Sequence, residues 1–355
     1  MSQRAEQNTG TRDVTPAHRF DEERLLEYLS SHVESFDGPL SVRQFKGGQS
    51  NPTYLLDAGS GRYVLRRKPP GKLLKSAHAV DREFRIISAL YAAGFAVPRP
   101  LVLCEDDEVI GTTFFVMEFV EGRIFWDLDL PGLEPAERAA IYDNVNQTIA
   151  DLHNLDYAAM GLEDYGKPGN YFARQISRWT GQYKASETAT VEPMDSLIDW
   201  LPQNIPDDDS ASIVHGDYRL DNMIIHPTEP KVIAVLDWEL STIGHPLADF
   251  MYHVMIWQMP EIGIGSVGLV DKPLDELGIP DEESYIQRYC DRTGRATGIS
   301  NRNFYSAFNF FRLAAILQGI AGRVRDGTAA SAHAAQAVNA VRPLADLGWR
   351  FANRG

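Results

Sequence analysis

The chain has 355 residues, enough for two domains or one large two-lobed unit, and its 44% hydrophobic and 23% charged residues exclude a wholly disordered or fibrous protein. The two cysteines, Cys104 and Cys290, exclude a disulfide scaffold and a cysteine-based zinc site and suit a reducing cytoplasm, where we expect the protein to be. The net charge of −15 argues against a sequence-independent nucleic-acid binder, and no apolar run approaches the ~20 residues that a membrane helix needs. We therefore expect partners that are neither nucleic acids nor membranes.

The charge is distributed unevenly along the chain. Residues 1–120 carry 15 Lys and Arg against 16 Asp and Glu, whereas residues 121–355 carry 19 against 33. The acidic second part suits a metal ion or a cationic substrate, and an ordinary solvated surface is the alternative for both parts. The first part gathers several cations in a cluster suited to phosphate, namely Arg66, Arg67, Lys68, Lys72 and Lys75.

The first third of the sequence predicts a small antiparallel sheet with helices. Residues 1–17 are polar and lack the apolar segment of a signal peptide, so we expect a disordered leader there. Apolar residues recur at helical spacing in residues 21–33 and 79–93, which are predicted helices. Asp106 and Asp107 are the expected turn before the last strand. Five short runs between turn residues are predicted strands: 40–45, 52–57, 62–67, 101–104 and 113–119.

The rest of the sequence is mainly helical in pattern, from Glu134 to the alanine-rich stretch at residues 329–347. Further helices are predicted near 171–183 and 194–201. The change of pattern places a domain boundary between residues 120 and 121. Three strand-length runs interrupt the helical part: 212–214, 222–226 and 232–236.

The most informative segment runs from one of these strands into His215-Gly216-Asp217, with Asn222 five residues after the aspartate. Phosphoryl transfer needs a carboxylate to orient the attacking hydroxyl and an oxygen ligand that helps to hold Mg²⁺. Fifteen residues after Asn222, Asp237 ends another apolar strand, where it suits a cation shared with nucleotide phosphates. Taken singly, Asp217 is equally a turn residue and Asp237 a strand-end cap, but three elements at compatible spacing favour the catalytic interpretation.

These motifs resemble the catalytic and metal loops of kinases, and the spellings His-Gly-Asp and Asp-Trp-Glu resemble the aminoglycoside phosphotransferase and choline-kinase-like family. The resemblance spans residues 40–250. It implies an α+β, protein-kinase-like bilobal fold with a nucleotide-binding β-rich lobe at residues 18–120 and a helical lobe at residues 121–355. It also implies ATP and Mg²⁺ as cofactors, Asp217 as the catalytic base or orienter, and Asn222 and Asp237 as metal ligands.

The segment from Phe45 to Tyr54 resembles the glycine-rich loop of that family. Glycine permits close approach of the backbone, so amides at Gly47 and Gly48, with the Ser50 hydroxyl and Asn51, are the expected phosphate contacts. A Gly-Gly pair between strands is otherwise an ordinary hairpin.

The segment Tyr63-Val64-Leu65-Arg66 occupies the place of the kinase Val-Ala-x-Lys motif. Strand alternation puts Val64 and Arg66 on one face, where Val64 would cover the adenine and Arg66 would hold the phosphates. Glu83 shares a helix face with Ile87, so it is expected to turn inward and pair with Arg66, with a surface ion pair as the equal alternative. Arginine in place of lysine departs from the kinase pattern and makes binding a firmer expectation than catalysis.

The segment from Phe115 to Gly122 resembles the connection between kinase lobes, with Met117 in the gatekeeper place. By the resemblance, the Glu118 carbonyl and the Val120 amide meet the adenine edge. Farther along, we expect Asp249 to brace the catalytic loop or cap a helix. His153 and His215 are expected to be structural.

Residues 67–78, which lead to Asp81-Arg82-Glu83, resemble the kinase-like domains associated with acyl-CoA dehydrogenases. This basic loop suits binding of a phosphate group of CoA. The alternative is that it binds only ATP. The acidic run Asp207-Asp208-Asp209 is expected to be a solvated loop, with guidance of a cationic substrate as the alternative.

We therefore predict an enzyme that transfers the γ-phosphoryl group of ATP to a hydroxyl of a small molecule, with an amino alcohol, an aminoglycoside or a hydroxyacyl-CoA as acceptor. The alternative is a nucleotide-binding pseudokinase that acts as a regulatory or partner-binding module. Protein kinase activity is disfavoured, because no Ala-Pro-Glu follows Asp237 and nine residues leave little room for an activation segment.

Overall fold

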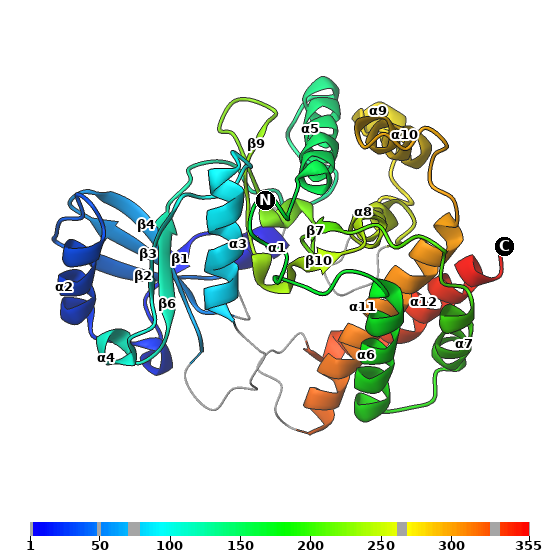
Figure 1. The fold of residues 1–355 in the computed structure, drawn as a ribbon, viewed down its shortest axis with the longest axis horizontal. Coiled ribbons are helices and arrows are strands. Elements are labelled where there is room, and N and C mark those ends of the chain that lie inside the picture. Colours follow the sequence, from blue (N-terminus) through cyan, green and yellow to red (C-terminus); the bar gives the residue numbers. More distant parts are fainter. Residues whose placement is uncertain (1–2, 48–50, 70–78, 261–267, 327–333, 355) are drawn as a thin grey trace. The chain divides into compact units, whose positions relative to one another are not determined.

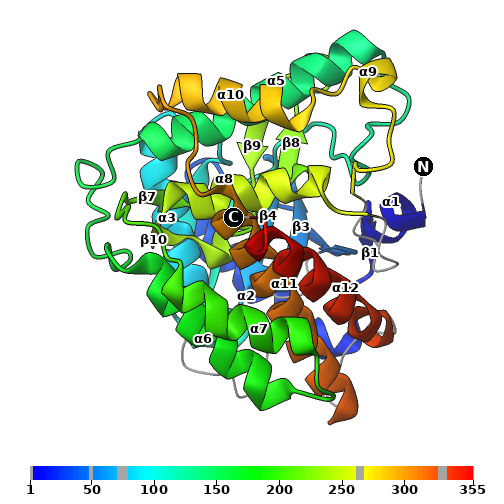
Figure 2. The same ribbon diagram turned by 90° about the vertical axis from the view of Figure 1, so that its right-hand side faces the viewer.

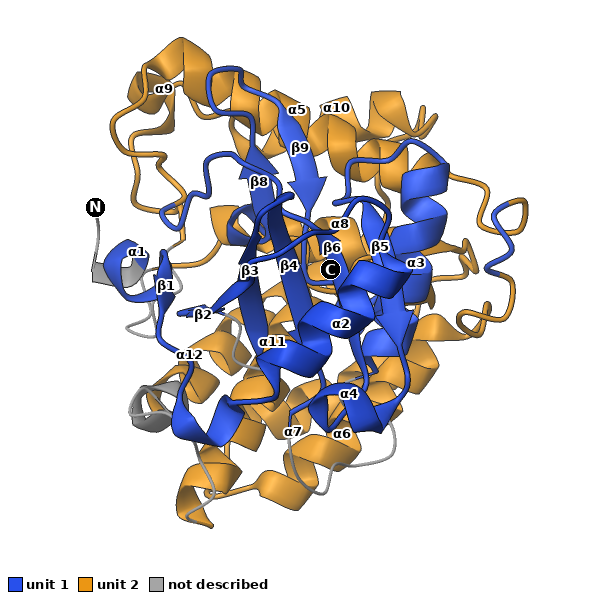
Figure 3. Cartoon of the chain, turned by 90° about the vertical axis from the view of Figure 1, so that its left-hand side faces the viewer, with its two compact units in different colours: residues 1–127, 160–162, 219–241 blue, residues 128–159, 163–218, 242–355 orange. Residues whose placement is uncertain are grey.

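The computed structural model of the chain describes residues 3–47, 51–69, 79–260, 268–326 and 334–354. The chain divides into two compact units, which Figure 3 colours separately. Unit 1 consists of Met1–Asp127, Met160–Leu162 and Arg219–Ser241. Unit 2 consists of Leu128–Ala159, Glu163–Tyr218 and Thr242–Gly355. A single boundary between residues 120 and 121 does not describe these units, because the segment that carries Asn222 and Asp237 packs with the sheet of unit 1.

Unit 1 is built on one antiparallel sheet whose strand order is β1-β2-β3-β4-β6-β5. The five predicted strands are confirmed, and a sixth is added at the edge. The expected turn at Asp106 is instead the cap of a one-turn helix, α4 (Asp107–Ile110), since its side chain accepts a hydrogen bond from the Glu108 amide. The strands are β1 (Thr11–Arg12), β2 (Ser41–Phe45), β3 (Thr53–Ala58), β4 (Gly61–Arg67), β5 (Pro100–Cys104) and β6 (Phe114–Glu118).

The expected disordered leader is wrong for residues 3–12, which form α1 (Gln3–Asn8) and β1. Thr11 pairs with Phe45 and Arg12 with Gln44, so backbone hydrogen bonds to β2 order the segment. Arg43 Nε also donates to the Thr11 hydroxyl at 2.9 Å. A two-residue edge strand needs no apolar alternation, so the polar sequence of β1 did not predict a strand.

Two helices cover opposite faces of the sheet (Figures 1 and 3). Asp21 caps α2 (Glu22–His32) by accepting from two backbone amides, and Leu25 and Leu29 of this helix pack in one core with Leu65 of β4. On the other face lies α3 (Val80–Ala92), which packs on β5 and β6. Strand alternation thus sends Leu65 to one face and its neighbours Val64 and Arg66 to the other.

A short hairpin completes unit 1. It consists of β8 (Met223–Ile225) and β9 (Val232–Val235), which pair antiparallel. The Arg123 amide donates to the Ile225 carbonyl at 2.7 Å, and the Ile225 amide returns a bond to Arg123 at 2.8 Å. Gly122 permits this approach, since a Cβ there would lie 2.4 Å from the Ile224 side chain and 2.5 Å from the Ile225 carbonyl oxygen. The connection after β6 is therefore fastened to the hairpin.

Unit 2 is mainly helical and contains the strand pair of β7 (Ser212–Val214) with β10 (Thr242–Gly244). The long helix α11 (Arg302–Arg325) packs against α12 (Ala334–Ala352) and α6 (Tyr171–Ser186), as Figure 2 shows. The other helices are α5 (Pro135–Asn154), α7 (Glu192–Trp200), α8 (Pro246–Val254), α9 (Leu274–Leu277) and α10 (Glu282–Arg292). Within the described residues, no helix is both long and apolar enough to cross a membrane.

Candidate functional site

Unit 1 contains a cavity of about 440 Å³. This volume falls in the range of roughly 300–1,000 Å³ that is typical of small-molecule sites. Residues of the sheet, of α3, of the connection after β6 and of the β8–β9 hairpin line it. Of the predicted site residues, the lining includes Gly47, Val64, Arg66, Glu83, Met117, Glu118, Val120, Asn222 and Asp237.

Three charged side chains meet inside this cavity. Arg66 Nε lies 3.2 Å from Glu83 Oε2, and Arg66 Nη2 donates to Asp237 Oδ1 at 2.9 Å. The side chain of Glu83 is 1% exposed, that of Arg66 10% and that of Asp237 35%. The predicted inward pairing of Glu83 with Arg66 is therefore observed, and Asp237 joins the pair from the more exposed side.

Burial and charge oppose each other in this group. Burial alone would lower the pKa of Arg66, but the neighbouring carboxylates, Glu83 first, raise it above its ordinary value. Burial raises the pKa of Glu83 to about 7, and Arg66 acts against this rise. Arg66 is therefore a permanent positive charge in the cavity, which suits an anionic ligand such as a phosphate.

The β8–β9 hairpin brings the two predicted metal ligands together. Asn222 directly precedes β8 and Asp237 follows β9, so antiparallel pairing puts them at the same end of the hairpin. The Leu236 amide donates to the Asn222 carbonyl at 2.8 Å. Asp237 adopts φ 65° and ψ 60°, a left-handed conformation that is uncommon for residues other than glycine and is found more often at functional sites.

The glycine-rich segment is described in part, because Gly48 and Ser50 lie outside the described residues. Gly47 lines the cavity. Asn51 is 1% exposed and is not among the lining residues; its Nδ2 donates to Glu239 Oε2 at 3.3 Å. The contact of Asn51 with a carboxylate next to the Asp237 loop fits a bracing role better than a phosphate contact.

The connection after β6 forms another side of the cavity. Met117 is buried and Glu118 is exposed at the end of β6. The Glu118 amide donates to the Arg99 carbonyl at 2.9 Å, and Val120 follows in the lining. The segment from Met117 to Val120 therefore lines the cavity.

Sequence reasoning missed a wall of the cavity that comes from the N-terminal segment. Asn8, Gly10 and Trp126 line the cavity beside Gly47. Trp126 Nε1 donates to the Thr9 hydroxyl at 3.1 Å, which ties the segment to the indole ring. No local pattern signals this wall, because Trp126 lies more than a hundred positions from Asn8 and Gly10.

The basic cluster divides in the structure. Arg67 is 3% exposed, donates to the His18 carbonyl at 2.9 Å and stacks on Phe20, so it serves the core of unit 1. Lys68 lies 3.4 Å from Asp81. Lys72 and Lys75 lie outside the described residues. Of the members of the predicted phosphate cluster that the structure describes, Arg66 lines the cavity and Arg67 and Lys68 do not.

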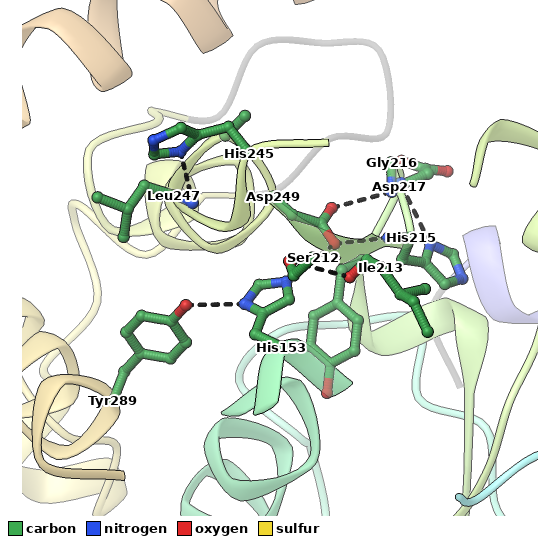
Figure 4. A network of polar contacts seen from close by, with 12 residues as sticks. His153, Ser212, Ile213, His215, Gly216, Asp217, His245, Leu247, Asp249 and Tyr289 are labelled. Carbon is green, nitrogen blue, oxygen red and sulfur yellow. Dashed lines mark hydrogen bonds and ion pairs between the residues drawn. The ribbon is translucent and has the colours of Figure 1, made fainter. Parts of the chain in front are cut away.

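The loop that carries Asp217 belongs to unit 2 and is held by buried side chains (Figure 4). Asp249 accepts hydrogen bonds from the His215 amide at 2.6 Å and from the Gly216 amide at 2.9 Å. His153 lies 3.5 Å from Asp249 Oδ2 and contacts the Tyr289 hydroxyl at 2.7 Å. Burial favours a higher pKa for Asp249, but hydrogen bonds and charge from His153 and the loop lower it overall.

These contacts agree with the structural roles expected for Asp249, His153 and His215. The Asp217 amide donates to His215 Nδ1 at 3.2 Å, so His215 braces its own loop. The acidic run also has structural contacts, since Asp208 lies 3.3 Å from His245 Nε2 and Asp209 accepts from the Asn170 amide at 2.8 Å. The run is therefore not simply a solvated loop.

The antiparallel sheet with its α3 ion pair, together with the helical unit that carries the His-Gly-Asp loop, defines the class of protein as a kinase-like α+β phosphotransferase. Residues 41–274 match the sequence profile of the phosphotransferase enzyme family, and the chain belongs to this family.

Two relatives place the chain more closely. Acyl-CoA dehydrogenase family member 11 of Rattus norvegicus is 45% identical over 349 residues, which cover 97% of this chain and 45% of that protein, so the chain spans less than half of that relative. A crystal structure from Ralstonia eutropha, provisionally assigned as an aminoglycoside phosphotransferase, is 55% identical with a TM-score of 0.85 and covers 95% of this chain and 99% of that one. The predicted resemblance to kinase-like domains associated with acyl-CoA dehydrogenases is confirmed.

A more distant neighbour shows the fold alone. A thermostable mutant of aminoglycoside phosphotransferase APH(4)-Ia, solved as a ternary complex with AMP-PNP and hygromycin B, is 17% identical. Its TM-score is 0.59, and the match covers 92% of this chain and 98% of that one.

Proposed function

We propose that this protein transfers the γ-phosphoryl group of ATP to a hydroxyl of a small molecule. The observation that carries the proposal is the meeting of Arg66, Glu83 and Asp237 in one cavity of unit 1. A fixed cation next to a partly exposed carboxylate suits a nucleotide triphosphate that arrives with a divalent metal ion. Family membership and the nucleotide complex of APH(4)-Ia support the same choice of co-substrate.

In this proposal, ATP binds in the cavity of unit 1. Val64 and Met117 contact the adenine, while the Glu118 carbonyl and the Val120 amide meet its polar edge. Arg66 holds the phosphates, and Glu83 fixes the position of Arg66. The lining of the cavity by Val64, Met117, Glu118 and Val120 supports this assignment.

The donor set at the end of the β8–β9 hairpin fits Mg²⁺. Asn222 and Asp237 offer an amide oxygen and a carboxylate, and Mg²⁺ in nucleotide sites uses one or two carboxylates together with substrate phosphates. Asn222 and Asp237 would hold Mg²⁺, which supplies neutralisation of phosphate charge during transfer.

Asp217 is assigned to the acceptor hydroxyl. Its carboxylate orients that hydroxyl and takes its proton as the hydroxyl oxygen forms a bond to the γ-phosphorus and the bond to the β-bridging oxygen breaks, which releases ADP. Arg66 stabilises the negative charge that the phosphate oxygens carry during the step. The fixed loop around His215 and Gly216 supports a role that demands a constant orientation.

The proposed phosphoryl acceptors can be ranked by the support that each one has. We infer that a hydroxyacyl-CoA is the first acceptor to test, because a relative that matches 97% of this chain carries the name of an acyl-CoA dehydrogenase family member. Aminoglycosides and amino alcohols follow, since APH(4)-Ia was solved with hygromycin B and unit 2 contains most of the acidic part of the chain.

A nucleotide-binding pseudokinase is the second candidate, and Arg66 favours it. Arginine replaces the expected lysine and already pairs with Asp237, the proposed metal ligand, at 2.9 Å. If this pair persists when ATP binds, Asp237 is not released for Mg²⁺ and transfer does not follow.

The test is a transfer assay with Mg²⁺ and ATP against hydroxyacyl-CoAs, aminoglycosides, amino alcohols and sugars, read by mass spectrometry of the acceptor. Asp217→Asn is the catalytic blank, and Asp275→Asn, the same change at an exposed position on α9, is the matched control. We expect a phosphorylated acceptor with wild type and Asp275→Asn, and a rate lower by about 10²- to 10⁴-fold with Asp217→Asn.

Two outcomes would contradict the proposal. ATP that raises the melting temperature without transfer to any acceptor would identify the pseudokinase. Equal rates of transfer by wild type and Asp217→Asn would show that Asp217 has no role in the reaction.

A further inference from the structure

Tyr252 contacts the proposed catalytic carboxylate from a second element of unit 2. It lies on α8, one turn after Asp249, and its hydroxyl donates a hydrogen bond to Asp217 Oδ1 at 2.7 Å. The Tyr252 side chain is 5% exposed, so this hydroxyl is fixed in direction by the packing around the ring. An ionised carboxylate only accepts hydrogen bonds, which makes the phenol the donor.

Arg312 braces the same ring from α11. Its guanidinium carbon lies 5.0 Å from the centre of the Tyr252 ring, within the range of a cation–π contact. The same guanidinium donates from Nη2 to the Gly216 carbonyl. Arg312 is 7% exposed, so one buried cation holds both the backbone before Asp217 and the tyrosine on its carboxylate.

The backbone of the loop is fixed on both sides of Gly216. This glycine has φ +84°, a left-handed conformation that other residues seldom adopt. Its amide donates to Asp249 and its carbonyl accepts from Arg312. The loop is held in this way, and the hydrogen bond from Tyr252 then restricts the orientation of the Asp217 side chain.

We propose that Tyr252 is a positioning residue for phosphoryl transfer, which holds the carboxylate of Asp217 in the orientation that meets the acceptor hydroxyl, with Arg312 bracing the tyrosine ring. The inference rests on the proposed function, because it assigns Tyr252 to the reaction through Asp217. A carboxylate free to rotate spends part of its time misaligned, and small misplacements of reacting groups cost large factors in rate.

The test compares Tyr252→Phe with wild type. The variant removes one hydroxyl and keeps the ring that Arg312 covers. Tyr142→Phe is the matched control, since Tyr142 is a buried tyrosine of unit 2 on α5 whose hydroxyl donates to the Leu128 carbonyl at 2.6 Å. Each protein is assayed for kcat and for the KM of ATP, and the ¹³C carboxylate signal of Asp217 is assigned by its loss in Asp217→Asn.

Tyr252→Phe is expected to lower kcat by about 10- to 100-fold. We expect the KM of ATP to stay within about twofold, because the nucleotide cavity belongs to unit 1. The Asp217 signal is expected to move in Tyr252→Phe and to stay in place in Tyr142→Phe. A purely structural tyrosine would lower stability without this separation of kcat from KM.

An unmoved Asp217 signal in Tyr252→Phe overturns the inference, whatever the rate does. An unchanged kcat in Tyr252→Phe, or an equal loss of kcat in Tyr142→Phe, also overturns it, and the proposed function then stands on the activity of wild type. If wild type transfers no phosphoryl group while the signal still moves in Tyr252→Phe, the proposed function fails and the contact between Tyr252 and Asp217 stands.

Discussion

The two units hold their functional groups by different means. In unit 1, Val64 and Arg66 reach the cavity because β4 alternates, and Asn222 and Asp237 share one end of a hairpin because its strands pair. In unit 2, Asp217 is held by buried side chains from other helices, among them Asp249, Tyr252 and Arg312. The proposed nucleotide site is therefore set by backbone register, whereas the proposed catalytic loop depends on long-range contacts between side chains.

This difference predicts that single side-chain changes act differently in the two units. In unit 1 they should alter the affinity for nucleotide or the balance of buried charge, since the strands keep the geometry. In unit 2 they should alter turnover or the pH dependence of stability, because polar side chains there hold the loop and its supporting helices. The following changes test this contrast, beginning with the largest expected effect.

Arg66→Met should destabilise the protein by about 3–5 kcal/mol, because it leaves the buried carboxylate of Glu83 without its partner. Urea unfolding measures the loss. The double variant Arg66→Met/Glu83→Gln should recover most of it, since a neutral amide replaces the unpaired charge. If Arg66→Met had the same unfolding free energy as wild type, Arg66 would not stabilise the buried carboxylate of Glu83.

His253 should make unit 2 sensitive to acid. Burial lowers the pKa of His253 to about 4, below the ordinary value of 6.5, so the unfolded chain binds a proton that the folded chain refuses. The stabilising effect of the neutral form is complete above pH 6.5 and is lost as the pH falls towards 4, by up to about 1.4 kcal/mol per pH unit. His245 has a lowered pKa for the same first cause and acts in the same direction.

The measurement is the unfolding free energy of wild type and His253→Gln between pH 7 and pH 4.5. The variant should have a smaller slope against pH, because one of the two imidazoles whose pKa is lowered by burial is removed. Equal slopes would show that His253 is not kept neutral by burial.

Trp126→Ala should weaken nucleotide binding about 10-fold, which corresponds to about 1.4 kcal/mol. The substitution removes the indole that lines the cavity and frees the Thr9 hydroxyl that orders the N-terminal segment. Calorimetric titration with AMP-PNP measures the change, and Trp349→Ala, on α12 of unit 2, is the control. Equal affinities of the two variants for AMP-PNP would show that the N-terminal segment and Trp126 do not contribute to nucleotide binding.

The sequence predicted the parts of the site that depend on local pattern. Alternation placed Val64 and Arg66 on one face, and helical spacing turned Glu83 towards them. The five strands followed from apolar runs between turn residues, whereas the two-residue β1 has no such run and was missed.

The remaining parts depend on contacts that no local pattern encodes. Trp126 and Thr9 lie 117 positions apart, and Tyr252 lies 35 positions from Asp217. Asn51 belongs to a loop that resembles a phosphate-binding motif, yet its side chain is directed to Glu239. Which of several polar residues in a loop meets a ligand is decided by tertiary packing, which sequence spacing alone does not determine.

The most direct test of this division compares Asp237→Ala and Asp217→Asn in one experiment, with binding of ATP in Mg²⁺ measured by calorimetry and transfer measured on the same samples. We expect Asp237→Ala to lose both the Mg²⁺-dependent part of ATP affinity and turnover, whereas Asp217→Asn should keep the affinity of wild type and lose turnover. Near-normal turnover in Asp237→Ala, or loss of ATP binding in Asp217→Asn, would contradict this expectation.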